Sequence, residues 1–217
     1  MAAVDMIISG RSKDLGGFTV SRVLPFAKRR RIGPFVFLDE IGPAVFEPGQ
    51  GIDVQPHPHI GLSTVTYLFE GEMDHADTLG VERTITPGAV NLMTAGRGIV
   101  HSERTGPAAR AAGHRLHGVQ VWLALPEGGE DIEPAFEHHS ADALPQIDQG
   151  GATIRLIMGE AWGARSPVRT YVPTLYAHVE APAGSVVETP RGGELGVYVV
   201  SGAVEIDGEP VGPGKLA

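Results

Sequence analysis

Two pairs of possible metal ligands stand in the first half of the chain, and in each pair a single residue separates the two ligands. The first pair is His57 and His59 in QPHPHIGLST, and the second is His101 and Glu103 in GRGIVHSE. On a β-strand, residues i and i+2 point to the same face, so each pair can aim two donor groups at one point. On adjacent strands of a closed sheet, the two pairs would surround one cation with three imidazoles and a carboxylate.

This ligand set predicts a catalytic transition metal. Imidazole binds iron, copper, zinc and nickel, and a carboxylate adds anionic character. Three histidines and one glutamate leave one or two positions of an octahedron open, and the absence of cysteine from the sequence removes any thiolate ligand. Such a site favours Fe(II) over a closed structural zinc, with other divalent transition metals as alternatives. The competing interpretation is that the histidines lie in a loop and that His101-Ser-Glu103 is a solvated turn.

The other histidines are expected outside the metal site. His75, in GEMDHADTLG, is expected on the surface of a hairpin. His114 and His117 could line a barrel mouth, but surface positions or satisfied core positions are favoured. His138 and His139 are adjacent, and adjacent residues of a strand point in opposite directions, so they are not expected to share a metal.

Charge limits the partners that the chain can bind. It has 17 Lys and Arg against 26 Asp and Glu, a net charge of −9, which argues against direct nucleic-acid binding and against a membrane surface. The basic run Lys28–Arg31 is interpreted as a solvated strand edge. No apolar run approaches the roughly 20 residues of a membrane span, and the N-terminus does not resemble a signal peptide, so a cytoplasmic location is expected.

The elements that must position the ligands are predicted to be β-strands. The 30 glycines and 17 prolines favour many turns, and no long helical period is present. Segments rich in Val, Ile, Thr, Tyr and Phe predict an all-β sandwich or barrel. The clearest predicted strands are Gly17–Val23, Phe35–Leu38, Leu62–Phe69, Val119–Ala124, Thr153–Gly159 and Gly196–Val200. Val65, Leu92 and Met93 are candidates for lining a dry cavity beside the metal.

A weak internal repeat predicts two related halves. TYLFEG (66–71) aligns with VYVVSG (197–202), and each is followed by a Pro-Gly turn signal. The expected organisation is residues 1–126 with the metal site, a linker region at 127–150, and residues 151–217 as a second, partial unit without a metal site. Chance similarity between two strands that end in glycine is the alternative.

The spacing of the ligands resembles the cupin barrel, a jelly-roll family with two metal motifs. Its first motif, G-x5-H-x-H-x3,4-E-x6-G, is matched by Gly51, His57, His59 and Gly71. The Glu position falls on Thr64, which is a departure from the pattern. The second motif, G-x2-H, is matched by Gly98 and His101, and Glu103 is the carboxylate that would replace the missing one.

In that departure from the cupin motif, the chain resembles one subfamily, the pirins. The resemblance is carried by RRIGPFVFLDEIGPA (30–44), GIDVQPHPHIGLSTVTYLFEGEMDHADTLG (51–80), PGAVNLMTAGRGIVHSER (87–104) and LHGVQVWLALP (116–126). It implies a bicupin, two jelly-roll barrels in tandem, with a metal, usually iron, in the N-terminal barrel alone. It also implies the ligands His57, His59, His101 and Glu103, the residues that the pairing already selected.

Pirin-like proteins are associated with quercetin 2,3-dioxygenase activity, which opens a flavonol ring with dioxygen and releases carbon monoxide. The resemblance therefore implies an aromatic small-molecule substrate, with Glu103 as the natural base. It equally implies a rival, a redox-sensing regulator that binds protein partners as a transcriptional or metabolic cofactor. A third interpretation is a metal that only stabilises the fold.

The second unit is expected to bind no metal. With Gly71 placed on Gly202, His57 corresponds to Glu188 and His59 to Pro190, and the counterparts of His101 and Glu103 would fall beyond Ala217. Pirin-like chains usually continue beyond this point, which favours a C-terminal truncation; a false repeat and a natural tail are the alternative. If the repeat is real, an unpaired strand edge is expected near Val197–Ile206.

Overall fold

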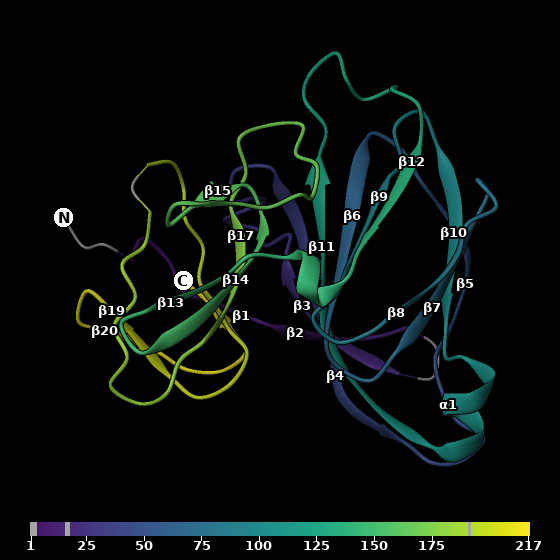
Figure 1. Cartoon of the computed structure of the whole chain (residues 1–217), viewed down its shortest axis with the longest axis horizontal. Coiled ribbons are helices and arrows are strands. Elements are labelled where there is room, and N and C mark those ends of the chain that lie inside the picture. Colours follow the sequence, from purple (N-terminus) through teal and green to yellow (C-terminus); the bar gives the residue numbers. More distant parts are fainter. Residues whose placement is uncertain (1–3, 16–17, 191) are drawn as a thin grey trace.

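The computed structural model describes residues 4–15, 18–190 and 192–217, and these residues fold almost entirely into β-strands (Figure 1). The described helices are short: α1 (Pro107–Ala112) and a 3-10 turn at Ala141–Ala143. The all-β prediction is confirmed. The finer expectation of two tandem jelly-roll barrels stays a prediction.

The first lobe, at the right of Figure 1, is built from two antiparallel sheets. In sheet order, the larger one contains β12 (Ala135–His139), β9 (Val90–Thr94), β6 (Leu62–Glu70), β11 (His114–Ala124), β4 (Phe35–Phe46), β3 (Thr19–Leu24) and β2 (Arg11–Asp14). The smaller one contains β5 (Asp53–His59), β10 (Ile99–Arg104), β7 (Met73–Asp77) and β8 (Glu82–Ile85). The two sheets lie opposite one another and enclose the candidate site.

The second lobe, at the left of Figure 1, consists of shorter strands. One sheet contains β1 (Ile8–Ser9), β21 (Lys215–Leu216) and β18 (Tyr198–Val199), and another contains β13 (Gln146–Gln149), β14 (Ala152–Met158) and β17 (Tyr176–Glu180). Two hairpins add β15 (Glu160–Ala161) with β16 (Ala164–Arg165), and β19 (Val204–Ile206) with β20 (Glu209–Val211). Because β1 pairs with β21, the two ends of the described chain meet in this lobe.

The predicted strands are present, with different boundaries. Phe35–Leu38 is the start of the longer β4, and Val119–Ala124 is the end of the longer β11. Leu62–Phe69 and Thr153–Gly159 correspond to β6 and β14, and Gly196–Val200 shortens to β18. Gly17–Val23 corresponds to β3, although Gly17 itself lies outside the described residues.

The segment 127–150 contains regular structure. Its β12 pairs with β9 at the edge of the seven-stranded sheet, and its β13 pairs with β14 of the second lobe. The division into residues 1–126, 127–150 and 151–217 stays a prediction. Near the C-terminal end, β18 forms the edge of its sheet, whereas β19 pairs with β20.

Alternation along the strands places neighbouring side chains in different apolar clusters. Val65 and Leu92 belong to the cluster that also contains Ile157 and Met158 of the second lobe. They therefore point away from the site, and their proposed place beside the metal is wrong. Met93 faces the other way and packs with Ile99 and partly buried Phe136 inside the first lobe. Successive residues of a strand point to opposite faces, and the neighbouring strands decide which face points towards the site. Because these neighbours were not known from the sequence, Val65 and Leu92 were assigned to the wrong face.

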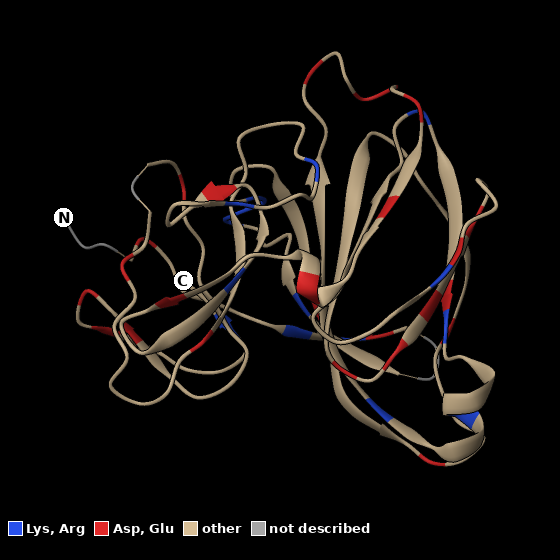
Figure 2. Ribbon diagram, viewed as in Figure 1, with Lys and Arg blue, Asp and Glu red and all other residues tan. Residues whose placement is uncertain are grey.

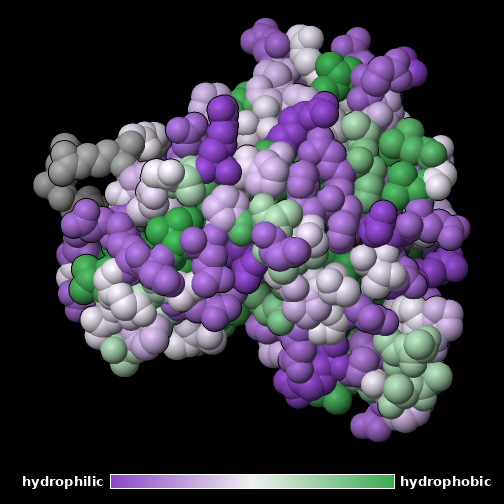
Figure 3. Space-filling view, viewed as in Figure 1, coloured by the Kyte–Doolittle hydropathy of each residue, from purple (hydrophilic) through white to green (hydrophobic). Residues whose placement is uncertain are grey.

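Charged residues of both signs are interspersed over both lobes (Figure 2). On the face shown in Figure 3, hydrophobic residues are scattered among hydrophilic ones. The basic run Lys28–Arg31 lies in a turn closed by backbone hydrogen bonds between Phe26 and Arg29, and not on a strand edge as predicted. Arg29 forms ion pairs with Asp5 and Glu194. In the described part of the chain, no helix is both long and apolar enough to cross a membrane.

Candidate metal centre

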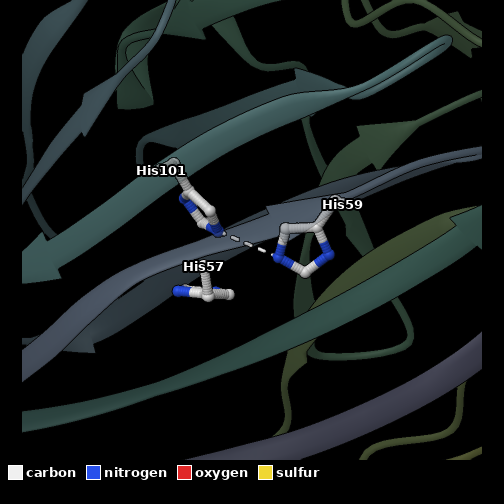
Figure 4. A group of neighbouring side chains, drawn as sticks. All are labelled: His57, His59 and His101. Atoms are coloured by element: carbon white, nitrogen blue, oxygen red, sulfur yellow. Dashed lines mark hydrogen bonds between the residues drawn. The ribbon is translucent and has the colours of Figure 1, made fainter.

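Three histidines from two neighbouring strands meet inside the first lobe. β5 and β10 pair antiparallel, with His101 opposite His57 and Ile99 opposite His59. In β10, Ile99, His101 and Glu103 are buried and the residues between them are more exposed, which is the alternation that the spacing predicted. One ring nitrogen from each of His57, His59 and His101 lies within 4.8 Å of the other two (Figure 4).

The hydrogen bonds indicate which nitrogen of each ring faces the centre. Nδ1 of His57 lies 2.9 Å from the backbone carbonyl oxygen of Gln55, and a carbonyl can only accept, so in the neutral ring Nδ1 carries the proton and Nε2 has the lone pair. Nε2 of His59 and Nε2 of His101 lie 3.0 Å apart. Two Nε2 atoms at this distance, with a third imidazole beside them, form a donor set that fits a divalent transition metal.

Burial keeps the rings of His59 and His101 neutral, which is the form that binds metals. Desolvation, with a smaller contribution from His57, lowers the pKa of His59 to about 4. Desolvation and the neighbouring imidazoles lower the pKa of His101 to about 2. At neutral pH these two rings therefore present lone pairs without having to lose a proton first.

Glu103 is buried at 7% exposure, on the same face of β10 as His101. Its carboxylate does not belong to the group formed by the three ring nitrogens. Oε1 accepts a 2.6 Å hydrogen bond from Nε2 of Gln120 on β11. Burial raises the pKa of Glu103, while His57 and the Gln120 hydrogen bond act in the opposite direction. The sequence did not single out Gln120; the available signal was an amide alternating with the apolar residues of a predicted strand.

An aromatic pair stands beside His59. Trp122 contacts His59 edge-on at 4.9 Å between ring centroids and stacks on Phe37 at 3.9 Å. The guanidinium of Arg22 lies 4.5 Å from the centroid of the Phe37 ring and pairs with Asp39 at 2.8 Å. The rings are therefore held in place from both sides.

His75 is buried at 6% exposure, and the prediction of a surface position is wrong. It lies on β7, directly next to β10, and its Nδ1 lies 3.3 Å from Nδ1 of His101. A hairpin was predicted correctly here, since β7 pairs with β8, but the inner face of that hairpin closes the lobe. The missed signal was the i, i+2 spacing of His75 and Asp77, the same spacing that marked the other two pairs.

The remaining histidines have partners elsewhere. His114 stacks on Phe46, and His117 pairs with Glu40 at 2.9 Å. On β12, Nδ1 of His138 lies 2.7 Å from Oδ1 of Asn91, and His139 pairs with Glu137 at 3.2 Å. No further metal-ligand group is found among the described residues.

A cavity of about 890 Å³ opens at the other end of the sheets, between β3 and β4, near Phe18, Phe46 and Arg110. None of the three histidines of the centre lines it. Volume alone would therefore have pointed away from the cluster of ligand atoms.

Comparisons with known proteins agree on the family. A family model described as Pirin matches residues 17–123. The chain is 49% identical over 218 residues to a pirin-like protein of Caulobacter vibrioides, and the match covers 99% of this chain and 75% of that protein. It is 43% identical to a Pseudomonas aeruginosa protein named as a candidate quercetin 2,3-dioxygenase, covering 97% of this chain and 66% of that protein.

The structural comparison indicates the same relationship. A crystal structure of quercetin 2,3-dioxygenase from Acinetobacter baumannii superimposes with a TM-score of 0.88 at 34% identity, over 97% of this chain and 70% of that chain. The expected relationship is confirmed by both sequence and structure. The chain belongs to the pirin family.

Proposed function

We propose that the protein is a metal-dependent dioxygenase, with Fe(II) as its metal, that opens flavonols such as quercetin. The observation that carries the proposal is the convergence of His57, His59 and His101, whose ligand nitrogens lie within 4.8 Å of one another. Two of these rings are kept neutral by burial, and the set contains no thiolate. Such a donor set leaves coordination positions open for a substrate and dioxygen.

Iron bound there would supply a Lewis acid that lowers the pKa of a flavonol hydroxyl, and a redox centre for dioxygen. The three histidines would hold it from β5 and β10, two hydrogen-bonded strands that fix the rings relative to each other. Glu103, as the fourth ligand or as a neighbour of the metal, adds the negative charge that the set otherwise lacks.

Glu103 is the proposed base for the flavonol hydroxyl. Its Oε1 is occupied by the amide of Gln120, which leaves Oε2 to accept the proton. A general base must lie within hydrogen-bond reach of the proton that it removes. The donated hydrogen bond favours the ionised carboxylate against the desolvation that opposes it.

The substrate class is supported by two relatives and by Trp122. The Pseudomonas relative is named as a candidate quercetin 2,3-dioxygenase, and the Acinetobacter structure is titled as one. Trp122 is only partly buried and offers an aromatic ring beside His59, suited to a planar aromatic ligand, whereas Phe37 is buried between Trp122 and the Arg22 guanidinium. The reaction adds one dioxygen to the flavonol and releases one carbon monoxide with the ring-opened ester, so it needs no external reductant.

The test is an absorbance assay of quercetin consumption. Protein loaded with Fe(II) under anaerobic conditions and then exposed to dioxygen should consume quercetin and release carbon monoxide faster than free iron does. The His57→Ala variant should fall to the free-iron rate. His139→Ala is the matched control, because His139 lies on β12 and pairs with Glu137, outside the centre. Wild-type protein that keeps its iron yet matches free iron would reject the proposed activity.

The regulatory alternative has a separate readout. A redox sensor would bind a protein partner differently in its Fe(II) and Fe(III) states, while consuming no quercetin. Pull-downs with both iron states distinguish this function from the dioxygenase.

A further inference from the structure

A buried histidine–carboxylate pair stands directly behind His101. β7 pairs with β10, with His101 opposite Asp77 and Glu103 opposite His75. The side chain of His75 is 6% exposed and that of Asp77 is 0% exposed. The ring of Phe136 stacks on His75 at 4.6 Å and holds its plane. The dioxygenase chemistry proposed above uses neither His75 nor Asp77.

The contacts form a chain of hydrogen bonds that ends at His101. Nε2 of His75 lies 2.8 Å from Oδ2 of Asp77, and Nδ1 of His75 lies 3.3 Å from Nδ1 of His101. The other carboxylate oxygen, Oδ1, accepts hydrogen bonds from the backbone N–H groups of Leu79 at 2.8 Å and Val81 at 3.2 Å. Asp77 is therefore held in place as an acceptor on both of its oxygens.

If both rings are neutral, these hydrogen bonds permit only one placement of the protons on His75 and His101. Because Oδ2 of Asp77 accepts, Nε2 of His75 carries the proton, which leaves Nδ1 of His75 as an acceptor. That acceptor requires the proton of His101 to sit on Nδ1, so Nε2 of His101 keeps its lone pair. The opposite arrangement would put the lone pair of His75 Nε2 against a carboxylate oxygen at 2.8 Å, with no proton between them.

We propose that His75 and Asp77 are positioning residues for the metal centre: they hold the Nδ1 proton of His101 and so direct its Nε2 lone pair at the metal. The inference rests on the metal site proposed above. Ligating histidines commonly donate their second N–H to a carboxylate or a carbonyl, which fixes the ring and makes it a stronger donor. Here the carboxylate acts through an intervening imidazole.

The groups that accept a hydrogen bond from Nδ1 of His57 and from Nδ1 of His101 are chemically different. His57 donates Nδ1–H to a neutral backbone carbonyl, that of Gln55, whereas His101 donates towards an imidazole backed by a carboxylate. His101 is therefore expected to be the more electron-donating of these two ligands. A stronger donor favours Fe(III) over Fe(II), so losing the Asp77 charge should move the reduction potential of bound iron in the positive direction.

The decisive variant is Asp77→Asn, because it reverses the direction of the hydrogen bonds between residue 77, His75 and His101. An Asn that accepts the Leu79 and Val81 N–H groups presents its NH2 to His75, whose Nε2 must then accept. Nδ1 of His75 becomes a donor towards His101, and the proton of His101 is moved to Nε2, where it blocks the metal. Asp77→Asn should therefore lower Zn(II) affinity about 10- to 100-fold, the usual effect of losing such a partner.

The experiment measures Zn(II) affinity by chelator competition in wild type, Asp77→Asn, His75→Phe and His75→Gln. His75→Phe keeps the stacking on Phe136 but removes the acceptor, and should also weaken binding. His75→Gln retains a carbonyl acceptor and should recover part of the loss. Asp74→Asn is the matched control, since Asp74 lies on the same strand and accepts from Thr84 at 2.5 Å; its affinity should equal that of wild type.

Two further readouts separate positioning from general damage. Long-range ¹⁵N–¹H spectra of the zinc-loaded protein should show His101 ligated through Nε2 with a proton on Nδ1. The reduction potential of iron-loaded Asp77→Asn should be more positive than that of wild type. If Asp77→Asn fails to fold because its turn is lost, His75→Phe and His75→Gln carry the same comparison.

The outcomes are distinguishable. Wild-type protein that binds no zinc would overturn the metal site itself. Wild-type protein that binds zinc, with Asp77→Asn and His75→Phe binding equally tightly, would overturn this inference and leave the metal site standing. A doubly protonated His75 in the zinc-loaded protein would also overturn it.

Discussion

Nε2 of Gln120 lies 2.6 Å from Oε1 of Glu103, and this amide can face the carboxylate in only one way. Nε1–H of Trp122 donates to Oε1 of Gln120 at 3.2 Å, so the carbonyl end of the amide is already engaged. The NH2 end is thereby turned towards Glu103. A buried carboxylate that would otherwise favour its neutral form receives a donor that favours its anion.

Replacing Gln120 by Leu should reduce quercetin turnover while zinc affinity changes little. The variant removes the donor that holds Glu103 but leaves the three imidazoles untouched. The loss expected for such a supporting contact is about 10- to 100-fold in kcat/KM. Steady-state kinetics on iron-loaded protein, with Zn(II) affinity measured in parallel, would check it; equal loss of metal and turnover would mean that Gln120 supports the fold instead.

Glu103→Gln should separate proton removal from metal retention. The substitution preserves size but removes the charge, and a general base typically contributes about 10²- to 10⁴-fold. We expect a rate loss in that range with most of the metal retained. Full activity with the pH profile of wild type would show that Glu103 is not the base.

Each pair of candidate ligands was predictable because it depends on local geometry. The i, i+2 spacing of His57 and His59, and of His101 and Glu103, places each pair on one face of any strand. That the two strands are neighbours is a long-range fact, and the family resemblance supplied it. His75 was missed because GEMDHADTLG reads equally well as a hairpin tip; which face of that hairpin is buried depends on β10, 26 residues further along.

His178 should make the contact between the lobes sensitive to acid. The hydroxyl of Tyr67 lies 3.0 Å from Nδ1 of His178, across 111 residues of sequence. Desolvation lowers the pKa of His178, an effect that Glu180 opposes and Arg155 reinforces. As the pH falls, the unfolded chain therefore binds a proton at His178 before the folded chain does. The stabilisation of the folded state by neutral His178 is complete above the ordinary pKa of about 6.5 and is lost as the pH falls below it.

Urea unfolding at pH about 7.5 and about 5.5 checks this expectation, with the window set by the ordinary histidine pKa. Wild type should lose more free energy of unfolding between the two pH values than His178→Gln does. The buried histidines of the metal centre are present in both proteins, so the difference isolates His178. An identical pH dependence in the two proteins would show that His178 is as easily protonated in the folded state as in the unfolded state.

The two lobes should unfold together. Ile157 and Met158 of the second lobe share one apolar cluster with Val65 and Leu92 of the first. Ile157→Ala should destabilise the whole chain by about 2–5 kcal/mol, the usual cost of truncating a buried Ile. Val186→Ala, at a position 70% exposed, is the control and should change stability by less than about 0.5 kcal/mol.

The two tryptophans of the chain report the lobes separately, since Trp122 lies in β11 and Trp162 follows β15. In Trp122→Phe and Trp162→Phe proteins, each fluorescence signal follows one lobe. Coincident transitions, shifted equally by Ile157→Ala, are expected. Separate midpoints would mean that the lobes are independent folding units.

The strand pairing of residues 127–150 was not predictable from composition. PEGGEDIEP carries the residues of a loop, and AFEHH, which forms β12, is too polar to signal a strand by itself. Its pairing with β9 supplies the order that its own sequence lacks. The strands Leu62–Phe69 and Val119–Ala124 were predictable, but the side on which the second lobe packs was not, which misplaced Val65 and Leu92.

Elemental analysis of purified wild-type and His57→Ala protein tests whether the three histidines hold one metal ion. One transition-metal ion per chain is expected in wild type, because His57, His59 and His101 form one group and, in the predicted repeat, the first two correspond to Glu188 and Pro190. His57→Ala should lose that ion. A ratio near zero after loading wild type with Fe(II), or a ratio near two with metal surviving His57→Ala, would contradict the account.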